Sequence, residues 1–151
     1  FRECIPQTAS YDAAFKLALK NAEAHHQSRR IRFVREDLFK PQTVRPAGWA
    51  DLVISNPPYI PSAEIPKLEP EVLQEPTLAL DGGPDGLDAI RAIVRDTPRH
   101  LKPGGWIALE IGSGQGAAVG AILAAAGFDS PMIKPDFNGH DRVAIARWQA
   151  K

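Results

Sequence analysis

The sequence is poor in cysteine and has no arrangement of residues typical of a metal site. A single cysteine, Cys4, occurs among the 151 residues. An internal disulfide is therefore excluded, and a structural zinc site would lack its usual thiolates. The four histidines do not have the spacing of metal ligands. We therefore expect no metal site.

An excess of charge and long apolar runs are also missing. Lys plus Arg and Asp plus Glu number 18 each, and neither sign forms a long run. Proteins that bind a phosphate backbone usually carry a clustered basic excess, so direct nucleic-acid binding is not expected. No apolar stretch approaches the roughly 20 residues that span a bilayer, and no apolar signal segment opens the chain. We expect a cytoplasmic protein that does not bind membranes.

The apolar pattern that is present alternates between helical and strand periods. It predicts helices over residues 11–26, 86–100 and 117–126, and strands over residues 31–34, 51–55, 106–111, 132–137 and 143–148. The LKPGG segment predicts a turn, and Asn138 with Gly139 predicts a terminal hairpin. This alternation indicates an α/β fold with a mainly parallel sheet, in which the apolar strand at 51–55 is covered on both faces.

A long proline-rich segment follows that strand. Residues 57–85 contain seven of the 14 prolines, and only a helical turn around residues 69–74 is expected there. Loops of this length in a compact domain are usually functional or disordered. Because ligands of α/β sheets lie beyond the carboxyl ends of the strands, the start of this segment is a candidate site.

The letters NPPY at the start of the segment form a rigid corner. Pro57 and Pro58 fix two φ angles and remove two backbone donors. The side-chain oxygen of Asn56 and the carbonyl of Pro57 could each accept one hydrogen of an amide or amine, with the Tyr59 ring against its flat face. Such a corner suits transfer of a small group to the held nitrogen. The same letters could also simply end a strand.

The corner and its surroundings resemble a known family. SNPPYIP after an apolar strand is similar to the signature of class I S-adenosylmethionine-dependent amino-methyltransferases. EPTLALDGGPDGLDAIRAIV, LKPGGWIALEIGSGQGAAV and NGHDRVAIAR then follow in the order of the HemK/PrmC family, over about residues 13–147. That family methylates the side-chain amide nitrogen of the glutamine in the GGQ loop of peptide chain release factors.

This resemblance implies a fold, a cofactor, a partner and site residues. The fold would be a Rossmann-like class I methyltransferase sheet, mostly parallel with an antiparallel C-terminal strand. S-adenosyl-L-methionine would be the cofactor and a release factor the partner. Asp37 and Leu38 would flank the adenine, Asn56 would also face the methyl group, and residues 75–86 would shape the substrate entrance. The glutamine would be held by Asn56, Pro57, Pro58 and Tyr59.

A second glycine motif, EIGSGQG at residues 110–116, resembles the loop that usually binds S-adenosylmethionine. It follows the corner, whereas the family's loop precedes it, so we interpret it as a strand-to-helix turn. The family's own glycine loop and N-terminal domain have no counterpart here, and Ala9 stands where the family has an acidic residue for the ribose. By itself, the chain should therefore bind S-adenosylmethionine weakly or not at all.

We accordingly expect the C-terminal part of a single methyltransferase domain, truncated at its N-terminus. A degenerate paralogue that kept only the corner is the alternative, and we prefer the first because Phe1 is not a start residue. Two other functions stay open. A permuted amino-methyltransferase of DNA or RNA would also place such a corner before a glycine loop, although the neutral charge counts against it. A non-catalytic module could bind a glutamine-bearing loop without chemistry.

Overall fold

The computed structural model describes residues 12–33 and 47–149. The chain divides into two compact units, Phe1–Val44 and Arg45–Lys151. In the first unit, α1 (Asp12–Ala24) confirms the helix predicted over residues 11–26. The Phe15 ring packs edge-on against Phe33 within this unit, with ring centroids 6.0 Å apart.

The strand predicted over residues 31–34 is not found. Residues 31–33 adopt no regular secondary structure, and Val34 lies outside the described residues. A strand needs a neighbour that accepts and donates its backbone hydrogen bonds. Within the described part of the chain, no strand pairs with this segment. The β-branched and aromatic composition alone was therefore an insufficient signal.

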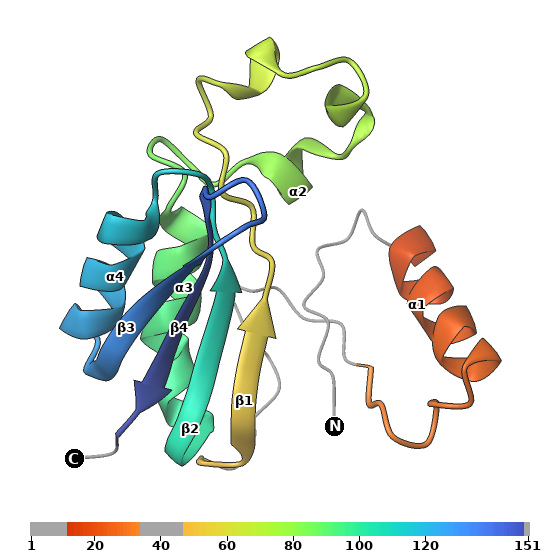
Figure 1. Ribbon diagram of the computed structural model, residues 1–151. Coiled ribbons are helices and arrows are strands. Elements are labelled where there is room, and N and C mark those ends of the chain that lie inside the picture. Colours follow the sequence, from red (N-terminus) through yellow and green to blue (C-terminus); the bar gives the residue numbers. More distant parts are fainter. Residues whose placement is uncertain (1–11, 34–46, 150–151) are drawn as a thin grey trace. The chain divides into compact units, whose positions relative to one another are not determined.

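The second unit is built on a four-stranded sheet in the order β1-β2-β4-β3 (Figure 1). Its strands are β1 (Ala50–Ser55), β2 (Leu101–Glu110), β3 (Phe128–Pro135) and β4 (Asp141–Trp148). Strands β1 and β2 are parallel, and β4 runs antiparallel to both β2 and β3. The predicted antiparallel C-terminal strand and terminal hairpin are confirmed. The parallel pairing in this sheet is between β1 and β2.

Strand β2 begins earlier than predicted, at Leu101, so the LKPGG segment belongs to the strand and the predicted turn was wrong. The segment is nevertheless irregular. From the pair Ala50–Leu101 to the pair Leu52–Trp106, β1 advances two residues (52 − 50) and β2 advances five (106 − 101). Gly104 has a φ of +81°, a conformation that glycine adopts without steric cost. The predicted turn residues thus form an irregularity inside β2.

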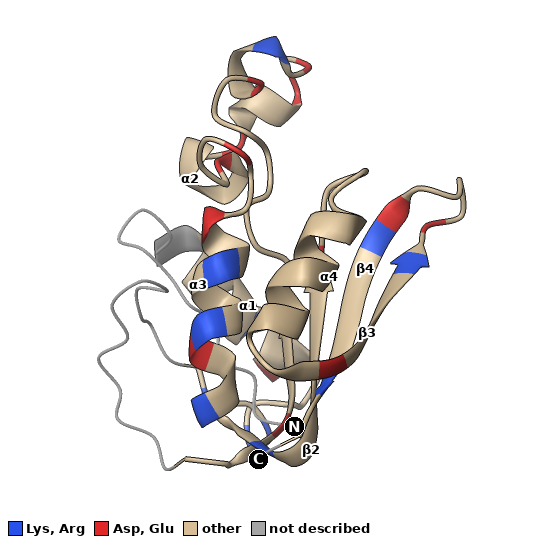
Figure 2. Cartoon of the chain, turned by 90° about the vertical axis from the view of Figure 1, so that its left-hand side faces the viewer, with Lys and Arg blue, Asp and Glu red and all other residues tan. Residues whose placement is uncertain are grey.

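Two helices, α3 (Asp88–Asp96) and α4 (Gly116–Ala125), cover one face of the sheet (Figures 1 and 2). They confirm the helices predicted over residues 86–100 and 117–126, and a short 3-10 helix, η4 (Thr97–Arg99), follows α3. Gly127, with a φ of +89°, ends α4 as predicted. The core between these helices and the sheet includes the fully buried side chains of Ile90, Val94, Ile107, Leu109, Ile111, Val119 and Leu123.

The opposite face of the sheet leaves apolar side chains exposed. Side chains alternate between the faces of a strand, so Leu52 and Ile54 lie on the face away from the buried Ile107 and Leu109. Leu52 is 42% exposed and Ile54 is 71% exposed. The prediction that this strand is covered on both faces is therefore wrong for the described part of the chain, where β1 is an edge strand.

Residues 60–82 form an arm beyond the carboxyl end of β1 (Figure 1). The arm contains η2 (Ile65–Lys67), η3 (Val72–Gln74) and α2 (Thr77–Leu80). The Ile60 amide donates to the Leu80 carbonyl at 3.0 Å, and the Gly82 amide donates to the Ile60 carbonyl at 2.9 Å. The helical turn expected around residues 69–74 is present as η3, and these bonds close the base of the arm beside the candidate corner.

Candidate functional site

The NPPY corner lies at the carboxyl end of β1, where the sequence predicts it. Ser55, the last residue of β1, pairs with Leu109 of β2, so the two parallel strands end side by side. Asn56 is exposed, and the residue that follows it, Pro57, is buried. The corner is thus a rigid segment whose base is held in the core and whose asparagine faces outward.

Some oxygen atoms of the corner accept hydrogen bonds within the protein, and others do not. The Tyr59 carbonyl accepts a hydrogen bond from Gln115 Nε2 at 3.1 Å, and the Ile60 carbonyl accepts one from Gly82. Among residues 12–33 and 47–149, no donor makes a hydrogen bond to the Asn56 side chain or to the Pro57 carbonyl. These are the two oxygens that the amide-binding hypothesis requires.

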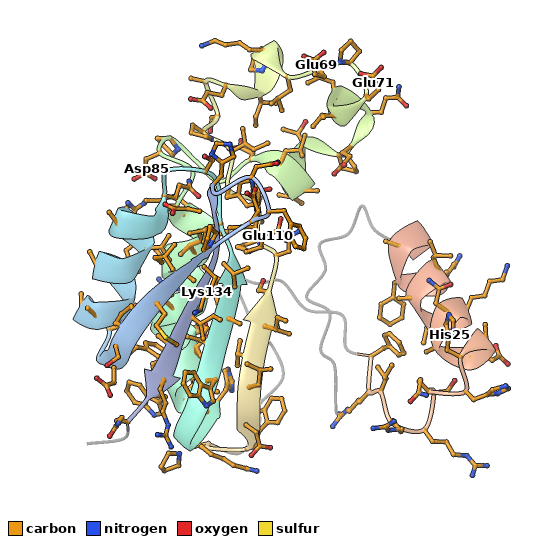
Figure 3. The ribbon with its side chains drawn as sticks, in the orientation of Figure 1. His25, Glu69, Glu71, Asp85, Glu110 and Lys134 are labelled. Carbon is orange, nitrogen blue, oxygen red and sulfur yellow. The ribbon has the colours of Figure 1, made fainter. Side chains whose placement is uncertain are left out.

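The Tyr59 ring is held from the neighbouring strand. Its hydroxyl donates to Glu110 Oε1 at 3.4 Å, and Glu110 is the last residue of β2 (Figure 3). Burial raises the pKa of Tyr59 above its ordinary value of 10.0, and the Glu110 carboxylate raises it further, although Arg142 opposes both effects. Tyr59 therefore stays neutral at physiological pH, with its ring half-buried at the edge of the corner.

The EIGSGQG segment connects β2 to α4, and the backbone amides of Gly112, Gln115 and Gly116 in this segment are used inside the protein. The Gly112 amide donates to Gln115 Oε1 at 2.8 Å, and the Gly116 amide donates to Asp141 Oδ2 at 3.1 Å. The Gln115 amide donates to the Gly112 carbonyl at 3.1 Å. A ligand-binding glycine loop needs such donors to point at the ligand. The engaged amides favour the interpretation of this segment as a strand-to-helix turn.

Of the three cofactor residues implied by the family resemblance, Asn56 is described, whereas Asp37 and Leu38 lie outside the described residues. Ala9, which stands where the family has an acidic residue, also lies outside them. Conversely, sequence reasoning missed Glu110 and Gln115 as neighbours of the corner. Both residues belong to the EIGSGQG motif, so they were visible in the sequence. Their contact with a corner more than 50 residues away was not.

The described residues contain neither a cluster of metal-binding side chains nor a helix that could span a membrane. Residues 12–33 and 47–149 contain no group of three or more His, Cys, Asp or Glu side chains that could hold a metal ion. Within the same ranges, every helix is too short or too polar to cross a membrane.

Sequence comparison links the chain to proteins of known family. It is 46% identical over 139 residues to the release factor glutamine methyltransferase of Cereibacter sphaeroides, and the match covers 91% of the chain and 49% of the relative. It is 51% identical over 136 residues to that of Gloeobacter violaceus, covering 89% and 46%. By sequence, the chain belongs to the release factor glutamine methyltransferase family. It spans about half the length of these curated relatives. No protein-family model matches the chain.

Solved structures similar to the chain show the methyltransferase fold. A methyltransferase from Pyrococcus furiosus matches with a TM-score of 0.65 at 16% identity, covering 97% of the chain and 62% of that structure. The METTL16 methyltransferase domain matches with a TM-score of 0.64 at 18% identity, covering 98% and 63%. At these identities the likeness extends to the fold alone, and it confirms the predicted class I, Rossmann-like sheet.

Proposed function

We propose that the NPPY corner binds the side-chain amide of a glutamine in a release factor and supports methylation of its nitrogen. The observation that carries this proposal is the pair of acceptors at the corner. Among the described residues, no donor bonds to the Asn56 side chain or to the carbonyls of Pro57 and Pro58, whereas the carbonyls of Tyr59 and Ile60 are used. The names of the curated relatives suggest the substrate.

The chemistry follows from the two hydrogens of a primary amide. One hydrogen would bind the Asn56 side-chain oxygen and the other the Pro57 carbonyl, so the nitrogen would be held in a single orientation. S-adenosylmethionine would supply an electrophilic methyl group. The nitrogen would form a bond to this methyl group as its bond to sulfur breaks, S-adenosylhomocysteine would leave, and one amide hydrogen would pass to solvent as a proton. As positive charge develops on the nitrogen, both hydrogen bonds strengthen, so the corner binds the transition state better than the ground state.

The Tyr59 ring would complete the amide site. Its hydroxyl is tied to Glu110, which limits rotation of the ring, and a ring in this place can lie flat against a planar amide. No general base with a shifted pKa is needed, because the protein contributes mainly by positioning. Asn56 would also face the methyl group, and Asp37 with Leu38 would flank the adenine. A release factor as substrate assigns the reaction to the cytoplasm.

A chimera tests this proposal, because the chain spans about half of its relatives. In the chimera, this chain replaces the matching part of the Cereibacter sphaeroides relative. We expect transfer of labelled methyl from S-adenosylmethionine to a release factor, but not to the factor whose GGQ glutamine is changed to alanine. Asn56→Ala should lower kcat at least 100-fold, because it removes one of two positioning contacts (of the order expected for misplaced reactants, about 10²-fold).

The matched control is Asn138→Ala, a second exposed asparagine, located in the turn between β3 and β4. It should leave transfer unchanged. The proposed function would be contradicted if the Asn56→Ala chimera were as active as the unsubstituted chimera. Methyl transfer to an oligonucleotide in place of the release factor would also contradict it.

Cofactor binding by the 151-residue chain itself is a separate expectation. Calorimetric titration with S-adenosylmethionine should show weak binding or none, because the glycine turn in residues 47–149 that resembles a cofactor loop uses its Gly112, Gln115 and Gly116 amides internally. Micromolar binding would contradict this expectation and would restore residues 112–116 as a candidate cofactor loop.

A further inference from the structure

Gln115 occupies a position at which its side chain can bond in only one way. It precedes α4, and its backbone amide and carbonyl are both engaged, with the Gly112 carbonyl and the Val119 amide. Around its side-chain amide lie one donor, the Gly112 N–H, and two acceptors, the carbonyls of Tyr59 and Gly86. Only an amide with its oxygen toward Gly112 and its nitrogen toward the two carbonyls satisfies all three.

Through these bonds, Gln115 joins three segments that are distant in sequence. Nε2 donates to the Tyr59 carbonyl at 3.1 Å and to the Gly86 carbonyl at 3.3 Å. Oε1 accepts from the Gly112 amide at 2.8 Å. One side chain therefore connects the corner after β1, the loop before α3 and the turn after β2. We call this set of three hydrogen bonds the Gln115 latch.

The latch has room only because its neighbours are glycines. A Cβ on Gly86 would collide with the Tyr59 carbonyl oxygen and would lie 2.8 Å from Gln115 Nε2. A Cβ on Gly112 would lie 2.9 Å from Gln115 Oε1 and 3.3 Å from Cδ2 of the Tyr59 ring. Contacts this short force one of the partners to move. The backbone at both glycines is thus shaped around the latch and the Tyr59 ring.

From this geometry we infer that Gln115 is a positioning residue for the amide-binding corner. This inference rests on the proposed function. Gln115 occupies one of the two lone pairs of the Tyr59 carbonyl oxygen, which weakens that oxygen as a competitor of the Asn56 and Pro57 oxygens for the hydrogens of the substrate amide. The latch also fixes the backbone that carries the Tyr59 ring. The latch thereby favours binding of the substrate amide at the Asn56 and Pro57 oxygens in one orientation, although Gln115 does not touch the amide.

Substitutions at residue 115 separate the two halves of the latch. In Gln115→Glu at neutral pH, the carboxylate still accepts from the Gly112 amide but can donate nothing to Tyr59 or Gly86. Gln115→Met has a similar length and loses all three bonds. Gln74→Glu is the matched control, because Gln74 is exposed at the end of η3 and its side chain makes no hydrogen bond among the described residues.

Amide hydrogen exchange of the 151-residue chain tests the latch directly. We expect Gln115→Met to lose protection at Gly112 and to exchange faster at Ile60 and Gly82, which flank the corner. Gln115→Glu should keep protection at Gly112 but lose it around the corner, and should regain it at acidic pH, where a protonated carboxyl can donate again. Wild-type exchange rates around the corner in both variants would overturn the inference, whatever the result of any activity assay.

The chimera described above tests the link from the latch to catalysis. Gln115→Glu should lower kcat at least tenfold at neutral pH with an unchanged KM for S-adenosylmethionine, and acidic pH should narrow the gap to the unsubstituted chimera. An unchanged kcat would overturn the positioning role. A rise in the KM for S-adenosylmethionine as large as the loss of kcat would also overturn it, since residues 112–116 would then contribute to cofactor binding. An inactive unsubstituted chimera would contradict the proposed function instead, and hydrogen exchange would still decide the latch.

Discussion

The hydroxyl of Tyr59 donates a hydrogen bond to Oε1 of Glu110 at 3.4 Å, across the carboxyl ends of two parallel strands. The bond joins the residue that closes the corner to the last residue of β2. Because the pKa of Tyr59 is raised, the hydroxyl keeps its proton and the bond persists through the physiological range. Burial is the largest cause of the raised pKa, and the Glu110 charge comes second.

Removal of the Glu110 charge should therefore lower the pKa of Tyr59 toward 10.0 without fully restoring it. We expect Glu110→Gln to shift the alkaline titration of Tyr59 to lower pH, measured by phenolate absorbance. The background variant Tyr11→Phe leaves Tyr59 as the one tyrosine of the chain, which has two.

Glu71→Gln is the control for this titration. Glu71 lies on the arm, well away from Glu110 (Figure 3), so its substitution should leave the Tyr59 titration unchanged. An upward shift in Glu110→Gln, or equal shifts in both variants, would show that the Glu110 carboxylate does not act on Tyr59 as its geometry indicates.

Gly86→Ala should destabilise the chain more than Gly114→Ala. The two glycines have similar φ angles, +75° and +81°, so alanine costs roughly 1–2 kcal/mol at either position through backbone strain. A Cβ at Gly114 would meet nothing within 4 Å, whereas one at Gly86 would collide with the Tyr59 carbonyl. Urea unfolding of both variants measures the difference. Equal losses of stability would mean that the corner can move to relieve the collision.

Thr97→Val should reduce the free energy of unfolding by about 0.5–1.5 kcal/mol, because it removes the hydroxyl, one of the two Thr97 donors that bond to the Ile93 carbonyl, and leaves the backbone amide. The Thr97 hydroxyl donates to the Ile93 carbonyl at 2.7 Å, and the residue is only 3% exposed. Thr97→Ser retains the donor and serves as the control for urea unfolding. A Thr97→Val chain as stable as the unsubstituted one would show that this hydrogen bond does not contribute to stability.

Acid should destabilise the hairpin turn between β3 and β4. The His140 amide and the Arg142 guanidinium lower the pKa of Asp136 below its ordinary value of 3.8. A carboxylate with a lowered pKa in the folded state stabilises the fold above its unfolded pKa, and this stability is lost as pH falls through the folded value. The urea midpoint should therefore fall as pH drops below 3.8.

In Asp136→Asn this decline should be smaller, because the titrating group is gone. Glu71→Gln is the matched control, since the Glu71 carboxylate accepts no hydrogen bond from the described residues, and it should decline as the unsubstituted chain does. An undiminished decline in Asp136→Asn would assign the acid sensitivity to other carboxylates, such as Asp81, whose pKa is lowered by Ser62 and the Gly83 amide.

Local signals in the sequence predicted most elements of the fold correctly. The helical spacing of Ile90, Ile93 and Val94 predicted α3, and these residues are buried against the sheet. Gly127 marked the end of α4. In each case the signal and the structure it specifies lie within a few residues of each other, so short-range steric and hydrophobic effects suffice.

The wrong predictions concern features that depend on distant partners. Residues 31–33 have strand-like composition but no strand beside them among the described residues. Leu52 and Ile54 are apolar, as in a strand that is covered on both faces of its sheet. Whether they are buried depends on which segments pack over them, and both are exposed. The NPPY corner was found from its letters, whereas its attachment to Gln115 was not, because only the folded sheet brings the two together.

The Gln115 latch also has an evolutionary consequence. Residues 59 and 115 are 56 positions apart, yet the bond between them leaves no space at two glycines on either side. A change at any one of these positions is costly unless the others change with it. Among related chains, Gly86, Gly112 and Gln115 should therefore be kept together or replaced together. A replacement at only one of these positions should mark a sequence in which the corner is no longer under selection.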